Sequence, residues 1–187
     1  VDFDALLEIN PDTIAWIRFD EPSIINYPVV KSADNNEYLT KTFAENDNKL
    51  GAIFMDMRNS SDFSDRNTII YGHHLNVSPD MFSRLHLYED EEFCKKHPDF
   101  YIYTPDGKVR TYTVFSAGVV NAAADNYDIE FASDEEFEQY IEICRESSNY
   151  QVDVEVNAQS QIVSLSTCTG DRRDERFLLQ GVLTSVD

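Results

Sequence analysis

Short apolar runs bounded by turn residues recur along the chain and predict a protein made mainly of β-strands. The runs are rich in Val, Ile, Phe and Tyr, the residue types that favour strands. The clearest pattern is a hairpin, in which Pro105-Asp106-Gly107 joins two such runs. The strands predicted in this way are 14–19, 24–30, 52–55, 68–71, 101–104, 109–120, 161–167 and 176–182.

Helical spacing appears at the start of the chain and again late in it. Apolar residues three and four positions apart predict an N-terminal helix at about 1–9. A second short helix is expected at 90–96. Ser133 and Glu136 have the spacing of a capping box, which predicts a helix from there to about Ser147.

A further helix start is indicated in the middle of the chain. Ser78 is a residue type that caps helices, and Pro79 is favoured at the first helical position. We therefore expect a helix that begins at Ser78. Its inward face would consist of Met81, Phe82, Leu85 and Tyr88.

About eight strands with three or four helices between them are typical of a mostly antiparallel barrel or sandwich with helices on its flanks. The sequence contains no internal repeat, low-complexity tract or linker that would divide it. We therefore expect residues 1–187 to form a single domain.

Composition narrows the class of protein. The chain has 187 residues, of which 42% are hydrophobic and 12% aromatic, enough for a folded core rather than a disordered chain. Its 35 acidic and 15 basic residues give a net charge of −20, which repels a phosphate backbone and argues against nucleic-acid binding. No apolar run approaches the roughly 20 residues of a spanning helix, and the N-terminus is not a signal peptide.

Candidate chemistry begins with the thiols. The 3 cysteines cannot form a closed disulfide framework and are too far apart for a CxxC motif. Cys144 has apolar neighbours at helical spacing, which predicts a buried thiol that acts as a small hydrophobe. Cys94 is expected on a helix surface beside two lysines, which could lower the pKa of its thiol, but no base is held near it. Both are interpreted as unreactive.

Cys168 has a different setting. It ends an apolar strand, and residues 169–175 are polar or charged apart from one glycine. A strand end is a rigid mount beside loops, where reactive groups are often found. If the last two strands form a hairpin, Arg176 returns beside Cys168, where its guanidinium could stabilise a thiolate or an oxyanion. The spacing is equally compatible with surface ion pairs between Arg176 and the acidic residues of the loop.

A nucleophilic cysteine needs a base, and His73 is the best candidate among the 4 histidines. His86 and His97 fall on expected helices among charged neighbours, where solvated or capping roles are common. His73 follows a buried strand and Gly72, which could take a sharp turn that presents the histidine at a strand end. Such a histidine is more often structural, so its candidacy depends on the similar setting of Cys168.

Three motifs resemble those of sortases, and most of all class B sortases. The histidine motif is Thr68-Ile-Ile-Tyr-Gly-His-His-Leu75, the nucleophile motif Ser164-Leu-Ser-Thr-Cys168 is similar to the family's TLxTC, and Arg176 follows at the family's short distance. Ala15 and Ser164 depart from the glycine and threonine that are common in the family. The resemblance extends to Asn10-Pro-Asp-Thr-Ile-Ala-Trp-Ile17, Tyr27-Pro-Val-Val30, Asp34-Asn-Asn-Glu-Tyr-Leu39 and Gly51-Ala-Ile-Phe-Met-Asp56.

The resemblance implies a mostly β fold, a closed sortase-type β-barrel with flanking α-helices. It also implies a cysteine transpeptidase that cleaves a C-terminal sorting signal after threonine through a thioacyl-enzyme and transfers the protein to a cell-wall amine. Cys168 would be the nucleophile. His73 would carry protons, first to the leaving amine and then from the attacking one. Arg176 would bind the threonine carbonyl and stabilise the oxyanion.

By position in the motifs, the resemblance implies that Ser166 and Thr167 line the substrate groove and that Leu75 forms its opposite wall. It implies no cofactor and no metal. The partners would be the sorting-signal peptide and an amine from a peptidoglycan precursor or a pilin. The protein would act at the extracytoplasmic face of a Gram-positive cell membrane, held there by an N-terminal anchor absent from this chain.

The sequence leaves three alternatives open. The same site could polymerise pilins, or could only hydrolyse the signal as a cysteine peptidase, because the competition between amine and water depends on a groove shape that sequence does not show. A non-catalytic surface binding module with the same barrel is the third. Such a module would be expected to lose at least one of His73, Cys168 and Arg176, and all are present.

Overall fold

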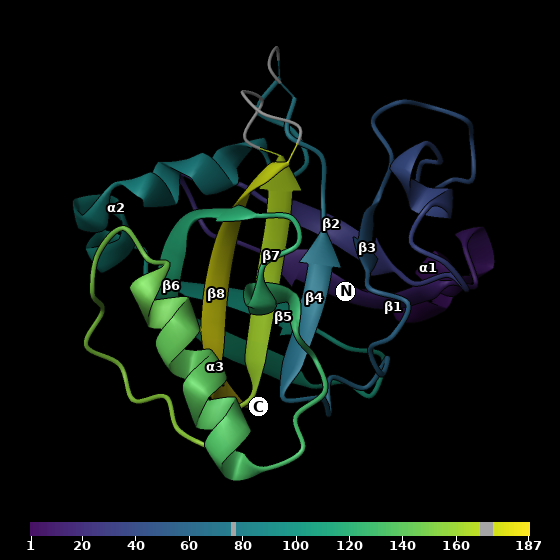
Figure 1. Cartoon of the computed structure of the whole chain (residues 1–187). Coiled ribbons are helices and arrows are strands. Elements are labelled where there is room, and N and C mark those ends of the chain that lie inside the picture. The colour runs from purple at the N-terminus through teal and green to yellow at the C-terminus, as the bar shows by residue number, and fades with distance from the viewer. Residues whose placement is uncertain (76–77, 169–173) are drawn as a thin grey trace.

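The structure is a computed structural model that describes residues 1–75, 78–168 and 174–187, with Cys168 described through its backbone alone (Figure 1). In this part of the chain, eight strands close into a barrel in the order β1-β2-β3-β4-β7-β8-β6-β5. The predicted mostly β barrel with flanking helices is therefore confirmed. The strands are β1 Thr13–Arg18, β2 Asn26–Val30, β3 Ile53–Met55, β4 Asn67–Tyr71, β5 Asp99–Tyr103, β6 Val109–Asn121, β7 Ile162–Cys168 and β8 Glu175–Val186.

The helices lie on the flanks of the barrel, and most are inserted between strands along the chain (Figure 1). Most neighbouring strands are antiparallel, but β2 pairs with β3 and β4 pairs with β7 in parallel. The helices are α1 Phe3–Ile9, α2 Glu91–Lys96 and α3 Asp134–Glu146, and the 3-10 helices are η1 Glu37–Leu39, η2 Ser83–Glu89 and η3 Asp125–Tyr127.

Two apolar cores flank the β6–β8–β7 wall. The larger one fills the barrel, where Val163 and Leu165 of β7 pack together with the stacked rings of Phe100 and Tyr112. The smaller one lies between the outer face of the wall and α3, which crosses it in Figure 1. The β7 strand is thus buried on both faces, which makes it a rigid support for the residues at its end.

The capping signal of α3 is confirmed. The Ser133 side chain accepts a hydrogen bond from the Glu136 N–H, and the helix ends at Glu146 with Ser147 as its C-terminal cap. The inward face of α3 carries the apolar residues expected of it, and it buries Cys144 completely. Burial raises the pKa of the Cys144 thiol to about 11, which keeps this thiol protonated and inert at neutral pH.

The prediction that a helix begins at Ser78 is wrong. The helical segment η2 begins at Ser83, because Met81 has a φ of 56°, which a right-handed helix does not accommodate. Tertiary contacts hold this turn: the Met81 N–H donates to the Tyr27 hydroxyl at 3.1 Å and the Phe82 N–H to the His73 carbonyl at 3.1 Å. The residues expected to point inward are nonetheless buried, namely Met81, Phe82, Leu85 and Tyr88.

Cys94 was expected on a helix surface, and this is wrong. The α2 helix packs against η2, and Cys94 is only 2% exposed and lies within the main apolar cluster. Burial raises the pKa of its thiol. The conclusion that Cys94 is unreactive is supported by this burial rather than by the lack of a nearby base.

Candidate active site

Three adjacent strands bring the candidate residues to one end of the barrel wall. The β7 strand lies between β4 and β8. On one side Cys168 pairs with Arg176 across the antiparallel β7–β8 ladder, as the predicted hairpin requires. On the other side Tyr71 pairs with Ser166 in the parallel β4–β7 ladder. His73 lies two residues after Tyr71, and Cys168 lies two residues after Ser166. Because Arg176 pairs with Cys168, the backbones of all three candidates lie at the same end of these strands.

The sharp backbone turn predicted at Gly72 is not formed. The glycine is needed instead because other side chains pack closely against it. Its φ is not positive, and its N–H continues the strand ladder by donating to the Ser166 carbonyl at 3.1 Å. A Cβ on Gly72 would lie 2.5 Å from Cδ1 of Ile53 and 2.6 Å from the Phe82 ring. The glycine therefore allows the end of β4 to approach η2, which places His73 beside β7.

A cleft of about 230 Å³ opens at these strand ends. His73, Arg176, Ser166 and Thr167, all predicted site residues, line it. Leu75 is half-buried and packs against the main core instead, outside the described lining of this cleft. The remaining polar wall comes from Asn35 and Tyr71, and the apolar wall includes Leu39 and Phe54.

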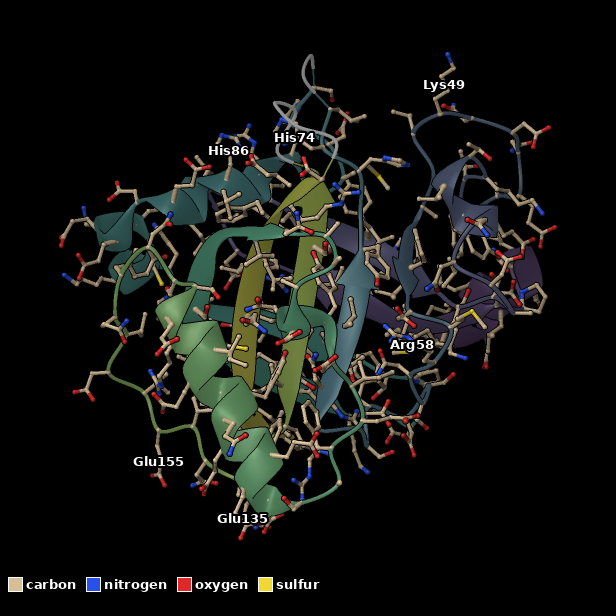
Figure 2. The ribbon with its side chains drawn as sticks, viewed as in Figure 1. Lys49, Arg58, His74, His86, Glu135 and Glu155 are labelled. Carbon is tan, nitrogen blue, oxygen red and sulfur yellow. The ribbon has the colours of Figure 1, made fainter. Side chains whose placement is uncertain are left out.

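A second hollow of about 450 Å³ continues from the cleft and shares Asn35, Tyr71, Ser166 and Arg176 with it. It extends to η3 and to the segment after β3, which contains Arg58. In Figure 2, Arg58 lies well away from His74 and His86. The two hollows together form a groove with Arg176 at the junction. Clefts of several hundred Å³ with a few placed polar groups are typical of ligand sites.

His73 and His74 are adjacent in sequence but have different surroundings. The His73 ring lines the cleft, with Nε2 at 2.7 Å from the Leu39 carbonyl oxygen. The His74 ring packs edge-on against His86, with centroids 5.9 Å apart, and Figure 2 shows both beyond the strand ends. The tertiary structure therefore selects His73 as the histidine of the cleft.

Arg176 lines both hollows, and its Nη1 also donates to the Glu175 carbonyl at 2.8 Å. Of the three acidic residues expected as surface partners of Arg176, namely Asp171, Asp174 and Glu175, the first lies outside the described residues. Because Arg176 is half-buried at the start of β8, its guanidinium is positioned by a strand. This arrangement suits a group that binds a carbonyl or an oxyanion.

Asp56 organises the polar wall of the groove, and the sequence reasoning missed it. Its side chain is buried and accepts hydrogen bonds from Nε of Arg58 at 2.9 Å, from the Tyr71 hydroxyl at 2.8 Å and from the Asn35 amide at 3.2 Å. Burial alone would raise the pKa of the Asp56 carboxyl, but the hydrogen bonds from Arg58 and Tyr71 lower it overall. The period-2 alternation of β4 could have revealed Tyr71, because it points to the same side as His73.

Asp56→Ala should destabilise the fold by about 2 kcal/mol at neutral pH, because the donor groups of Arg58, Tyr71 and Asn35 lose a buried acceptor. The pKa of Asp56 is lower in the folded chain than its ordinary 3.8, so its stabilising effect is present above that value and is lost as pH falls through the folded pKa. Urea unfolding at pH 7 and in acid should show the difference from the unmodified protein shrinking at low pH. The exposed carboxylate variant Asp62→Ala serves as control, and an equal loss in both would contradict a special role for Asp56.

Within the described residues, no group of three or more His, Cys, Asp or Glu side chains is arranged to hold a metal ion. The same part of the chain contains no helix that is both long and apolar enough to cross a membrane.

Comparison with known proteins adds independent information. Residues 20–184 match the Sortase domain family. In sequence, the chain is 33% identical to Sortase B of Listeria monocytogenes over 184 residues, which covers 96% of this chain and 73% of that protein. It is 35% identical to Sortase B of Staphylococcus aureus over 167 residues, covering 89% of this chain and 67% of that protein.

Solved structures agree with the sequence comparison. The Staphylococcus aureus sortase B–substrate complex superposes with a TM-score of 0.90 at 30% identity, covering 98% of this chain and 84% of that one. Clostridium perfringens sortase B superposes with a TM-score of 0.91 at 27% identity, covering 98% of this chain and 100% of that one.

Proposed function

The chain belongs to the sortase family and resembles its class B members, and from this membership we propose that it is a cysteine transpeptidase that cleaves a sorting signal after threonine and transfers the protein to an amine acceptor. The observation that carries the proposal is the meeting of His73, Cys168 and Arg176 at three neighbouring strand ends beside a groove. These are the group types that thiol-based acyl transfer requires.

The proposed reaction has two steps. His73 takes the proton of the Cys168 thiol, and the thiolate attacks the threonine carbonyl carbon. His73 then gives this proton to the leaving amine, and the C–N bond breaks to leave a thioester. The acceptor amine then attacks the same carbon, His73 takes a proton from it, and the C–S bond breaks to release the thiolate. In both steps Arg176 would donate hydrogen bonds to the oxygen that gains negative charge.

The groove supports peptide binding in particular. The Thr167 hydroxyl is buried, lines the cleft and has no hydrogen-bond partner among the described residues. Such a group costs free energy unless a ligand satisfies it, so we assign Thr167 to binding of the substrate backbone. The Ser166 hydroxyl lies 2.7 Å from the Tyr127 hydroxyl and is proposed as a wall of the groove. The role of Leu75 as the opposite wall stays a prediction.

Incubation with a sorting-signal peptide, with and without an amine acceptor, tests the proposal. A transferase forms the new amide when the amine is present, and hydrolysis alone in both reactions would refute the transferase activity in favour of a cysteine peptidase. Comparison of a cell-wall peptide amine with a pilin lysine peptide as acceptor would separate anchoring from pilus assembly. A peptide library in the same assay would identify the sorting motif.

Arg176→Ala should lower kcat/KM for this reaction by about 100- to 1,000-fold, because it removes a donor to the developing oxyanion. Stability should change by less than about 1 kcal/mol, since the side chain is half-buried beside the groove. Arg176→Lys keeps the charge without the planar fork and should recover only part of the rate. Steady-state kinetics and thermal unfolding of both variants check this, and a loss of folding that accounts for the lost rate would contradict it.

We further propose that residues 1–187 act as one catalytic domain at the outer face of a Gram-positive cell membrane. The support is membership of a family whose Listeria and Staphylococcus members match this chain over most of its length. Fractionation of cells that express the full-length gene product would place the protein in the membrane or elsewhere.

A further inference from the structure

The hydrogen bond of His73 determines which of its ring nitrogens carries a proton. Its Nε2 lies 2.7 Å from the Leu39 carbonyl oxygen. A carbonyl oxygen has no proton to give, so Nε2 must be the donor. In a neutral imidazole only one nitrogen is protonated, and Nδ1 is then the acceptor.

The Leu39 carbonyl is held in place by a buried neighbour. Tyr38 is almost completely buried, and its hydroxyl donates to Oδ2 of Asp12 at 2.7 Å. The Tyr38 carbonyl accepts the N–H of Ala52 at 3.0 Å, which ties η1 to the start of β3. Leu39 follows in the same short helix, so its carbonyl cannot shift without breaking these contacts.

Gly51 closes over the same hydrogen bond from the other side. It has a φ of 62°, and a Cβ there would lie 2.9 Å from Cδ2 of His73 and 2.9 Å from the Leu39 carbonyl oxygen. The backbone at Gly51 therefore packs against both partners of the bond, and only glycine leaves space for the ring. Lys49, two residues before it, lies at the same end of the molecule as His74 (Figure 2).

We propose that the Leu39 carbonyl and Gly51 form an imidazole clamp that fixes His73 as the Nε2–H tautomer and assigns all proton transfer to Nδ1. In each turnover Nδ1 would take the proton of the Cys168 thiol, pass it to the leaving amine and later accept a proton from the attacking amine, while Nε2–H stays on the ring. The clamp orients the histidine as a carboxylate does in a Ser-His-Asp triad, but with a neutral acceptor. Its catalytic consequence rests on the proposed transpeptidase function, whereas the tautomer does not.

The tautomer can be measured without any enzymatic assay. NMR of the protein with ¹⁵N-labelled histidine distinguishes a protonated from an unprotonated ring nitrogen in the neutral form. The clamp predicts a proton on Nε2 and none on Nδ1 of His73. A proton on Nδ1, or an equal mixture, would overturn it.

The chain offers a matched pair of variants for the catalytic consequence. Gly51→Ala places a methyl group against the carbonyl oxygens of Tyr38 and Leu39 and against the His73 ring, whereas Gly107→Ala, at a φ of 82°, meets nothing within 4 Å. Both variants carry the strain of a left-handed residue, but only the first disturbs the clamp. We expect kcat/KM for transpeptidation to fall by roughly 10- to 100-fold in Gly51→Ala and to stay within about twofold in Gly107→Ala.

Gly51→Ala should also show a mixed His73 tautomer by NMR. It should stay folded at the assay temperature but melt below Gly107→Ala, because its methyl group crowds the Tyr38 and Leu39 carbonyls. If Gly51→Ala does not fold, Tyr38→Phe loosens the anchor of η1 without touching His73 and should give a smaller loss in the same direction. A folded Gly51→Ala with full activity and an unchanged tautomer overturns the clamp. If the unmodified protein shows the Nε2–H tautomer but transfers no peptide, the proposed function fails and the tautomer assignment stands.

Discussion

Cys168→Ala should abolish transpeptidation, with a fall of about 10⁴-fold or more, while the protein still folds. The thioester cannot form without the thiol, and neither His73 nor Arg176 offers a substitute nucleophile. Folding should be little affected, because the backbone pairing of Cys168 with Arg176 does not depend on the side chain. Product formation by chromatography, the thioacyl-enzyme by mass spectrometry and thermal unfolding by circular dichroism check the three statements.

The other two thiols are built-in controls for this experiment. Cys94→Ala and Cys144→Ala change buried side chains in the two cores, so each should cost about 1 kcal/mol of stability and leave activity within a few-fold. Loss of activity in either variant without unfolding would mean that the nucleophile is misassigned. Full activity in Cys168→Ala would refute the mechanism altogether.

His73→Ala should have the second largest effect, a fall in kcat/KM of about 10³- to 10⁴-fold. Both chemical steps need a proton carrier, and His73 is the only histidine among the described lining residues of the cleft. The loss should affect transfer and hydrolysis of the thioester alike, because each attacking group must lose a proton. Single-turnover measurements of acylation and deacylation would resolve the two steps.

Two companion variants sharpen the interpretation of that loss. His74→Ala changes the adjacent residue, whose ring packs on His86, and should keep most of the activity. His73→Gln carries an amide nitrogen at the distance of Nε2 and can donate to the Leu39 carbonyl, but it cannot carry a proton, so it should be as inactive as His73→Ala. Substantial activity in His73→Gln would show that His73 acts through structure and not through proton transfer.

Local patterns in the sequence predicted most elements, because the interactions that define them join residues close in the chain. The Pro105-Asp106-Gly107 turn and the Ser133 cap form as expected. The prediction of a helix start at Ser78 failed because the N–H groups of Met81 and Phe82 donate to the Tyr27 hydroxyl and the His73 carbonyl. These partners are not the nearby carbonyls that a helix would supply. Cys94 was placed wrongly because charged neighbours say nothing about how α2 docks on the barrel.

For the site, the sequence by itself determined the chemical groups and two of their positions. An apolar strand followed by a polar loop singled out Cys168, and a hairpin between consecutive strands brought Arg176 beside it. The sequence motifs also indicated the family, which the comparisons confirm. The pairing of Cys168 with Arg176 is confirmed, because it depends on the residues of one hairpin, whereas the catalytic roles of these residues stay predictions.

Only the tertiary structure placed His73 at the same site. The parallel pairing of β4 with β7 joins segments far apart in the chain, and no local pattern specifies which strands become neighbours in a barrel. The same holds for the Leu39 carbonyl, 34 residues from His73, and for the groove wall organised by Asp56. These contacts depend on how the closed barrel and its covering segments pack, which is a property of the whole fold.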